Sequence, residues 1–236
     1  MGDSTSIAWT DRTWNPWQGC HPVSEACAHC YMFRDKRRYG QDPEVVVRSS
    51  PATFRRPLSK SWATPAKVFT CSWSDFFIEE ADPWRAEAWD VIRRTPWLTY
   101  QILTKRPERI ADHLPPDWGE GWSNVWLGVT VENNKAMNRW GFLHAIPARV
   151  RFLSMEPLLE LVDPRSLEGS GVDWVIVGAE SGPGRRLCLQ GWVTRVVLRC
   201  HHSEVPCFVK QLHIDGEVVS NLALFPPHLQ VREFPR

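Results

Sequence analysis

The sequence contains no long apolar run. None of its segments approaches the ~18 apolar residues that cross a membrane, and residues 1–20 lack the apolar core of a secretion signal. We therefore expect a cytosolic protein without a membrane partner. The sequence also lacks an excess of charge of one sign, because 28 Lys and Arg residues face 27 Asp and Glu residues, for a net charge of +1. No global basic field points to a nucleic-acid partner.

The sequence contains seven cysteines. This odd number argues against a disulfide framework and for use of some of the cysteines as metal ligands. Cys20, Cys27 and Cys30 lie close together near the N-terminus. Three soft ligands of this kind suit an iron–sulfur cluster or a zinc ion. A zinc site would be completed by His21 or His29 as a Cys₃His set. The residues alone leave both kinds of centre open.

Short apolar runs alternate with amphipathic stretches, which predicts βα units on a parallel sheet. Strands are predicted over residues 13–18, 67–73, 100–104, 125–131, 150–154, 174–178 and 206–209. Helices are predicted over 24–39, from Asp82 as the N-cap, from about Pro107, over 133–144, from Pro157 as a turn or helix, and over 192–202.

Six or seven such units are fewer than the eight of a full barrel. We therefore expect an α/β fold, a partial (β/α)6–7 TIM-like barrel that is open on one side, with the cysteines in the loop after the first strand. Residues 1–236 would form a single domain, with an insertion at about 41–66 and a C-terminal flap at about 214–236.

Polar side chains gather directly after the predicted strands. In parallel α/β folds this carboxyl edge of the sheet is where ligands bind. The residues concerned are Ser72, Asp75, Thr104, Lys105, Glu132, Asn133, Glu156, Glu180, Lys210 and Gln211. Taken singly, each acid is equally well explained by an ion pair with a neighbouring arginine. Together on one edge, most of them are expected to bind a ligand.

Other reactive or charged residues have simpler interpretations. Cys71, at the end of the second predicted strand, is interpreted as a small core residue rather than a fourth ligand. Cys188, Cys200 and Cys207 are interpreted as packing residues. The pair at 105–106 fits either ligand binding or the start of a helix in solvent. The pair at 185–186 fits either a phosphate contact or plain surface.

Several phrases of the chain resemble the radical S-adenosylmethionine (SAM) superfamily. Cys-Ala-His-Cys-Tyr at 27–31 is similar to the last part of its cluster motif, although six residues separate Cys20 from Cys27 where three are usual. Over about residues 7–212, the chain resembles a phage-associated three-cysteine branch of this superfamily. The phrases are Thr-Trp-Asn-Pro-Trp-Gln-Gly-Cys, Leu-Thr-Lys-Arg-Pro-Glu-Arg, Ser-Met-Glu-Pro-Leu-Leu, Val-Gly-Ala-Glu-Ser-Gly-Pro-Gly and Phe-Val-Lys-Gln.

The resemblance implies a [4Fe–4S] cluster held by Cys20, Cys27 and Cys30, with SAM on the fourth iron. Reductive cleavage of SAM would give a 5′-deoxyadenosyl radical that takes a hydrogen atom from the substrate. It also implies a one-electron donor such as flavodoxin or ferredoxin, in the cytosol of a phage host. In the superfamily, main-chain atoms next to the third cysteine contact adenine, which here indicates His29.

The strand-end residues can be given roles on this scheme. Ser72 and Asp75 suit the ammonium of SAM and Lys105 its carboxylate. The ribose hydroxyls would bind Glu132 and Asn133. Residues on the later strands are assigned to the substrate, and these are Glu156, Glu180, Lys210 and Gln211.

The first hypothesis for the substrate is a nucleobase or nucleotide, in modification, rearrangement or repair of nucleic acid. Local basic clusters and fourteen tryptophans favour it through phosphate contacts and stacking, whereas the small net charge argues against a strong electrostatic footprint. One alternative is a radical SAM enzyme that acts on a small metabolite. Another is a zinc- or cluster-stabilised binding protein that acts with a partner enzyme.

Overall fold

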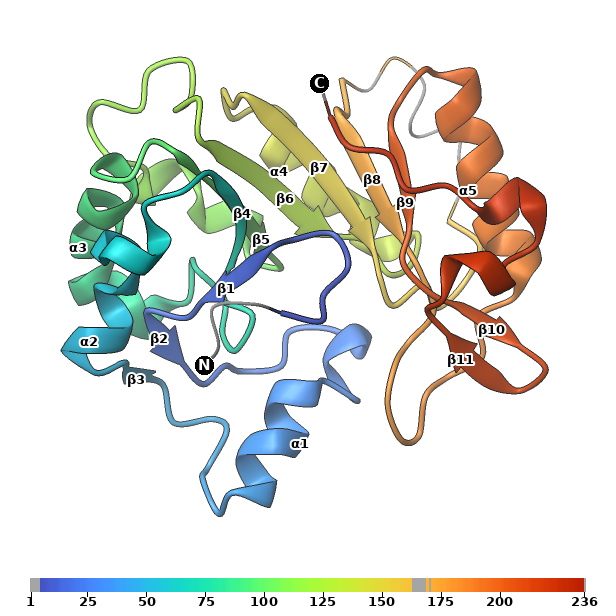
Figure 1. Cartoon of the computed structure of the whole chain (residues 1–236), viewed down its shortest axis with the longest axis horizontal. Coiled ribbons are helices and arrows are strands. Elements are labelled where there is room, and N and C mark those ends of the chain that lie inside the picture. Colours follow the sequence, from blue (N-terminus) through green and yellow to red (C-terminus); the bar gives the residue numbers. More distant parts are fainter. Residues whose placement is uncertain (1–4, 163–168, 170, 236) are drawn as a thin grey trace.

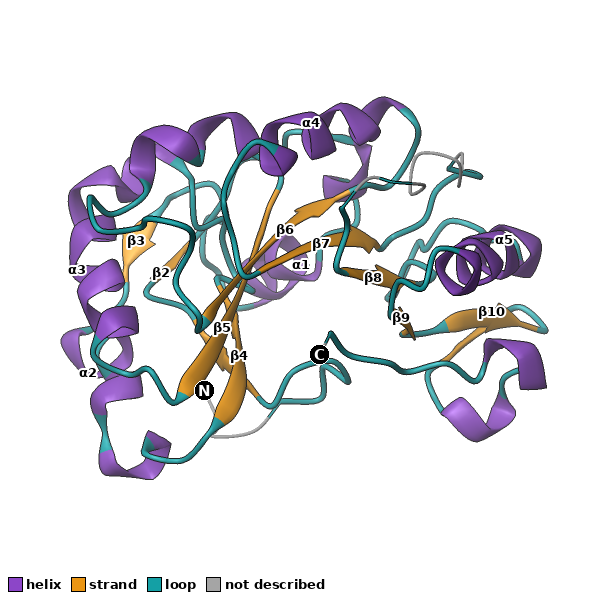
Figure 2. Ribbon diagram, turned by 90° about the horizontal axis from the view of Figure 1, so that it is seen from above, coloured by secondary structure: helices purple, strands orange, loops and turns teal. Residues whose placement is uncertain are grey.

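Seven parallel strands form one sheet that curls into a half-barrel (Figure 2). The computed structural model describes residues 5–162, 169 and 171–235. The strands neighbour one another in chain order, with β1 and β9 at the two ends. They are β1 (Arg12–Trp14), β4 (Ala66–Thr70), β5 (Leu98–Thr104), β6 (Val125–Thr130), β7 (Val150–Met155), β8 (Trp174–Val177) and β9 (Cys207–Val209). The prediction of a parallel α/β sheet that closes only in part is confirmed.

Helices cover the convex side of the sheet (Figure 2). These are α3 (Asp82–Arg93), α4 (Asn138–His144) and α5 (Gln190–His202), with α2 (Pro51–Phe54) beside α3. Between them and the sheet lies the main core, which includes Val68, Ile102, Leu127, Leu153 and Val175. Short 3-10 helices occupy Glu25–Cys27, Arg56–Leu58, Lys60–Trp62, Glu79–Ala81, Pro107–Arg109, Ala111–His113, Lys135–Met137, Leu222–Leu224 and Pro227–Leu229. Of the turn or helix predicted from Pro157, the helix is not found in the described residues that follow, because residues 157–162 contain only bends.

The concave side of the sheet is built in rows. Strand register places Gly128, Phe152 and Trp174 opposite one another. A Cβ on Gly128 would come within 2.3 Å of the Phe152 ring, so the glycine leaves room for the aromatic side chain. Phe152 and Trp174 belong to an aromatic cluster with Trp9, Phe69, Ile176 and Phe208. The next row toward the carboxyl ends is half polar, because Thr130 pairs with Ser154, which pairs in turn with Ile176. Polar side chains therefore enter the concave side on β6 and β7, near the carboxyl edge.

Two short antiparallel pairs flank the half-barrel. The strand predicted over 13–18 is two strands, because β2 (Trp17–Gln18) separates from β1 and pairs instead with β3 (Val47–Arg48). Pro16 lies between them and has no N–H to continue a ladder. The other pair is the hairpin of β10 (Leu212–Ile214) and β11 (Glu217–Val219).

The C-terminal segment returns along the last strand. The Val209 N–H donates to the Val231 carbonyl at 2.9 Å, and the Glu233 N–H donates to the Cys207 carbonyl at 2.8 Å. Phe208 forms an antiparallel bridge with Arg232. The outer side of β9 is therefore paired with residues far along the chain.

Helix α3 begins one residue earlier than predicted, with Ala81 as the N-cap and Asp82 as the first helical residue. The Asp82 carboxylate accepts hydrogen bonds from Arg85 at 2.6 Å and Arg109 at 2.8 Å, so it does not cap the helix. Partial burial opposes ionisation of this carboxyl, but the two guanidinium groups outweigh it and lower its pKa to about 2. Asp82 thus ties α3 to the segment after β5.

We expect Asp82→Asn to be less stable than the wild type at neutral pH, with a deficit that becomes smaller as the pH falls below about 4. An aspartate in an unfolded chain has a pKa of about 3.9, so the lower folded value stabilises the fold above that pH. That contribution is lost as the pH falls from about 4 towards about 2. Urea midpoints of both proteins at about pH 7 and about pH 3 test this. A deficit of equal size at both pH values would show that charge is not the cause.

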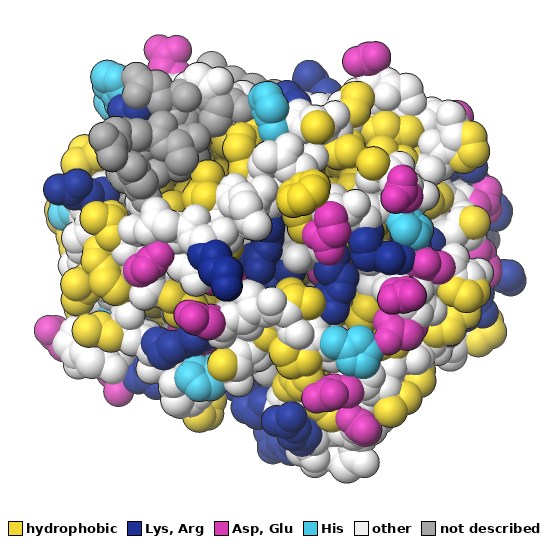
Figure 3. Space-filling model, turned by 180° about the vertical axis from the view of Figure 1, so that it is seen from behind, with side chains coloured by type: hydrophobic (Ala, Val, Ile, Leu, Met, Phe, Trp, Pro, Cys, Tyr) yellow, Lys and Arg dark blue, Asp and Glu magenta, His cyan; other side chains and the backbone are white. Residues whose placement is uncertain are grey.

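The helical face carries mixed charge. Figure 3 shows Lys and Arg side chains next to Asp and Glu side chains on this face, separated by hydrophobic groups. This agrees with the balanced composition. In the described part of the chain, no helix combines the length and apolar character needed to cross a membrane.

Candidate functional site

A cavity of about 630 Å³ lies on the concave side of the half-barrel, at the carboxyl ends of the strands. Trp9 and Phe69 of the aromatic cluster contribute to its wall. The residues of the row above, Thr130 and Ser154, also line it. Eleven of the predicted site residues line this one cavity: Cys20, Cys27, His29, Cys30, Ser72, Asp75, Lys105, Glu156, Glu180, Lys210 and Gln211. The structure therefore brings together residues from the beginning and the end of the chain.

The loop of residues 19–30, which we call the three-cysteine loop, lies at the carboxyl ends together with α1 (Tyr31–Arg38) (Figure 1). It begins at Gly19, whose φ of 97° and contact with the Val45 backbone leave no space for a side chain. The helix predicted over 24–39 is wrong in its first half. Cys27 ends a 3-10 turn, and Cys30 has a ψ of 126° as the N-cap of α1. Because the chain is extended at Cys30, the two thiols do not share one face of an α-helix.

The three cysteines of the loop differ from the other four. Cys20, Cys27 and Cys30 are free and half-buried, whereas Cys71, Cys188, Cys200 and Cys207 are free and buried. Burial, together with the charge of Asp75, raises the pKa of the Cys20 thiol to about 11, against the opposing effect of Arg106. Because the thiolate is the form that binds metal, binding at Cys20 would release a proton.

Within the described residues, no three His, Cys, Asp or Glu side chains converge closely enough to ligate a single metal ion. The donor set nevertheless fits an iron–sulfur cluster in kind and number, because such a cluster spreads its thiolate ligands over several iron atoms. Three free thiols from one loop line one cavity, whose wall contains both polar residues and apolar residues such as Ala26 and Phe33.

Asp75 connects β4 to β5 beneath the three-cysteine loop. One carboxylate oxygen accepts from the Thr104 hydroxyl at 2.7 Å, and the other accepts from the Lys105 N–H at 2.9 Å. Arg106 lies 3.4 Å from the same carboxylate. Asp75 is therefore already bonded within the protein while still lining the cavity. Ser72, its predicted partner in binding ammonium, exchanges hydrogen bonds with the Asn15 side chain.

Arg106 is a cavity residue that the sequence left open between ligand binding and an exposed surface. The exposed interpretation is wrong, because Arg106 is 9% exposed and lines the cavity. Its guanidinium donates to the His21 carbonyl at 3.0 Å and lies 3.7 Å from the Cys20 sulfur. Nothing in the local sequence distinguishes this arginine from Lys105 beside it, which is half-buried in the cavity wall.

Glu156, Lys210 and Gln211 form a second group in the cavity. The Lys210 ammonium is paired with the Glu156 carboxylate. The Gln211 amide donates to the Ala179 carbonyl at 2.5 Å and lies 3.4 Å from Glu156. This group presents a donor and an acceptor side by side, as recognition of a polar planar ligand requires.

Two predicted residues do not reach the cavity. Glu132 is fully buried and forms an ion pair of 2.7 Å with Arg139, one turn into the following helix. The Asn133 side chain accepts from the Ala136 N–H at 2.9 Å and so begins the 3-10 turn before α4. Both follow β6, but both are used by the segment that leaves the strand.

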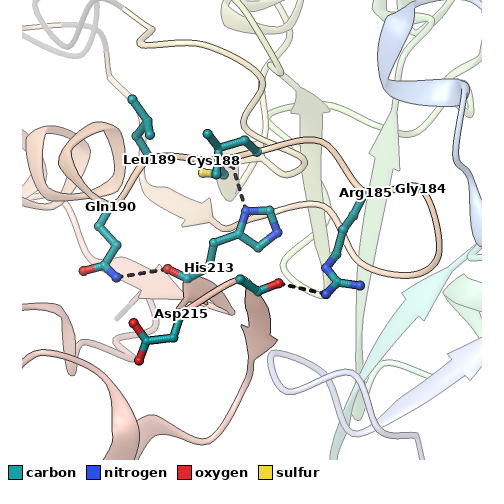
Figure 4. Close-up of a pocket in the computed structure, with 9 residues that line it drawn as sticks. Gly184, Arg185, Cys188, Leu189, Gln190, His213 and Asp215 are labelled. Atoms are coloured by element: carbon teal, nitrogen blue, oxygen red, sulfur yellow. Dashed lines mark hydrogen bonds between the residues drawn. The ribbon is translucent and has the colours of Figure 1, made fainter.

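A second cavity, of about 660 Å³, lies between residues 184–190 and the β10–β11 hairpin (Figure 4). The His213 ring accepts a hydrogen bond from the Cys188 N–H at 3.0 Å, and the Gln190 amide donates to the His213 carbonyl. Of the residues considered for ligand binding from the sequence, Arg185 lines this cavity, as one of the pair given as a phosphate contact or plain surface.

A family model described as "Protein of unknown function (DUF5131)" matches residues 4–221. The chain belongs to the DUF5131 family. No curated protein and no solved structure matches the chain. The DUF5131 match spans every residue that lines the main cavity, from Thr5 to Ser220.

Proposed function

We propose that this DUF5131 protein is a radical SAM enzyme that acts on a nucleobase or nucleotide-derived substrate. The observation that supports it best is the shared cavity. Three free, half-buried thiols from one loop line it together with eight other predicted residues. On this proposal the half-barrel is the partial TIM-like barrel of the superfamily, and the cavity at its carboxyl edge is the active site.

Cys20, Cys27 and Cys30 would hold a [4Fe–4S] cluster. When bound, the cluster supplies one electron to SAM, whose cleavage gives the 5′-deoxyadenosyl radical that takes a hydrogen atom from the substrate. A flavodoxin- or ferredoxin-like donor would provide that electron.

The protein's own residues would bind and orient the two ligands. Lys105 lines the cavity near Asp75 and can pair with the carboxylate of SAM. Glu156, Lys210 and Gln211 lie on the later strands and can bind the polar edge of a base through paired donors and acceptors. Trp9 and Phe69 form an apolar part of the cavity wall, which would limit the access of water to a reactive intermediate.

The size of the cavity favours a small ligand over a duplex. Its volume of about 630 Å³ is within the range of ~300–1,000 Å³ of small-molecule sites. A base within nucleic acid would have to be unpaired or flipped to enter it. The net charge of +1 also provides no excess of positive charge for binding a duplex. A free nucleotide or another small metabolite therefore remains the simplest ligand to test first.

Electron paramagnetic resonance of the anaerobically reconstituted, dithionite-reduced protein tests the proposal. We expect a reduced [4Fe–4S] signal that changes when SAM is added, together with about four irons and matching sulfide per chain. One tightly bound zinc and no iron would instead support the second candidate, a Cys₃His zinc protein that acts with a partner enzyme. A cluster signal indifferent to SAM would remove the radical mechanism.

A further inference from the structure

The first arm of the three-cysteine loop is held from β5. Arg106 is the second residue after β5 ends. It donates to the His21 carbonyl at 3.0 Å and lies 3.7 Å from the Cys20 sulfur. Its ion pair with Asp75 fixes the guanidinium from the other side. A buried arginine with partners on two segments has little freedom to move. Cys20 and His21 are thus tied to the sheet through one side chain.

The second arm is held from the loop after β8. Arg186 donates to the Glu25 carbonyl at 3.0 Å. It is paired with both oxygens of Glu180, which also accepts the Arg186 N–H at 2.8 Å. The same carboxylate lies 2.9 Å from His29 Nδ1. Glu25 and His29 lie on either side of Cys27, and His29 directly precedes Cys30. The contacts of Arg186 and Glu180 therefore hold the backbone next to the remaining two thiols.

The Glu180 carboxylate stays ionised in this arrangement. Burial opposes its ionisation, but hydrogen bonds from Arg186 and His29 outweigh the effect and lower its pKa to about 2. The loop after β8 also approaches α1 closely. A Cβ on Gly182 would lie 2.7 Å from the Arg34 guanidinium, and Gly182 has a φ of 92°. The positive φ favours glycine at this position, whereas the Arg34 guanidinium ends a flexible side chain that can move aside.

We propose that Arg106 and the Glu180–Arg186 pair are positioning residues that clamp the two arms of the three-cysteine loop. Apart from the turn at Glu25–Cys27, the loop has no regular structure of its own to fix the thiols. The clamp also joins parts of the half-barrel that are not sheet neighbours, because β8 does not pair with β1. Glu180, first assigned to the substrate, acts through the loop instead. The inference rests on the proposed function only in taking the thiols as ligands.

Arg185 supplies a matched control for Arg186. It is the adjacent residue on the same loop and carries the same charge. Its guanidinium donates to the Gly216 carbonyl and to Glu217, both at 3.0 Å, and Figure 4 shows it directed at the turn of the β10–β11 hairpin. A substitution there removes an arginine from the loop without touching the cysteine arms.

The test uses metal-free wild type, Arg186→Gln, Glu180→Gln, Arg106→Gln and the control Arg185→Gln. Iodoacetamide labelling followed by peptide mass mapping gives a rate for each thiol, and hydrogen exchange reports residues 19–22 and 24–30 separately. We expect Arg186→Gln and Glu180→Gln to raise labelling of Cys27 and Cys30 about tenfold, as loss of a charge-assisted hydrogen bond does for a local opening. Arg106→Gln should raise exchange mainly in 19–22. Arg185→Gln should change neither.

The proposal is overturned if Arg185→Gln matches Arg186→Gln, or if the labelling rates of Cys27 and Cys30 do not change. It is also overturned if exchange in β6 rises equally, because that would show global destabilisation. Arg186→Lys keeps the charge but not the forked geometry, so it should protect Cys27 and Cys30 only in part. All measurements are made without metal. A failed clamp is therefore distinguishable from a protein that binds no iron.

Discussion

Alanine in place of Cys20, Cys27 or Cys30 is expected to abolish retention of iron and sulfide while the chain stays folded. The three side chains are half-buried in a loop outside the sheet, so truncating any one removes little packing. Removing one thiolate would leave an iron without its protein ligand. Iron and sulfide assays after anaerobic reconstitution measure the loss. Circular dichroism and the thermal midpoint should stay close to those of the wild type.

Cys188→Ala and Cys200→Ala are the matched controls. Cys188 is buried beside the second cavity, and Cys200 is buried on α5. Both lie outside the lining of the main cavity. Each variant should therefore bind as much iron as the wild type. Loss of iron in either, without loss of fold, would mean that the ligands have been assigned incorrectly.

Trp174→Ala is expected to lower the free energy of unfolding by about 3–5 kcal/mol, the usual range for truncating a buried tryptophan. Trp174 is fully buried in the middle of the aromatic cluster. Its ring centroid lies 5.5 Å from that of Phe152 and 5.4 Å from that of Phe234. The indole N–H donates to the Glu233 carbonyl at 2.8 Å. Urea unfolding monitored by circular dichroism gives the change.

Trp97→Ala controls for loss of an indole with a similar hydrogen bond. Trp97 is 40% exposed, and its N–H donates to the Trp62 carbonyl at 2.7 Å. Its replacement removes far less buried apolar surface, so the loss should be well below that of Trp174→Ala. Equal losses at the two positions would contradict the view that the concave aromatic cluster supports the half-barrel.

The order and direction of the strands could be predicted because each buried strand is a short apolar run with its own boundary. The run predicted over 174–178 is β8 at Trp174–Val177, and that over 150–154 is β7 at Val150–Met155. Errors occurred where neighbours override the local pattern. Pro16 divides the first run into two strands that pair with different partners. The helix predicted over 24–39 is likewise divided, because a 3-10 turn ends at Cys27 and α1 begins only after Cys30.

The strand ends predicted which residues could reach the cavity, but not which way each side chain turns. Glu132 and Glu156 both follow a strand. Glu156 lines the cavity with Lys210, whereas Glu132 turns to Arg139 seven residues along the chain. The difference depends on the course of the chain after each strand. The sequence left Arg106 and Arg186 undecided between ligand contact and exposed surface for a related reason, since it does not show which carboxylate each arginine pairs with.

The pairing of the C-terminal segment with β9 shows that the residues that line the main cavity and the residues that cover the sheet edge lie in different parts of the chain. Every residue that lines the main cavity lies at or before Ser220, whereas the contacts that cover β9 come from Val231 to Glu233. A chain that ended at residue 221, where the family match ends, would keep the cavity lining but present β9 as an unpaired edge. Such an edge is a template for another copy of the same chain. The last fifteen residues, which follow the family match, would then matter for resistance to aggregation rather than for chemistry.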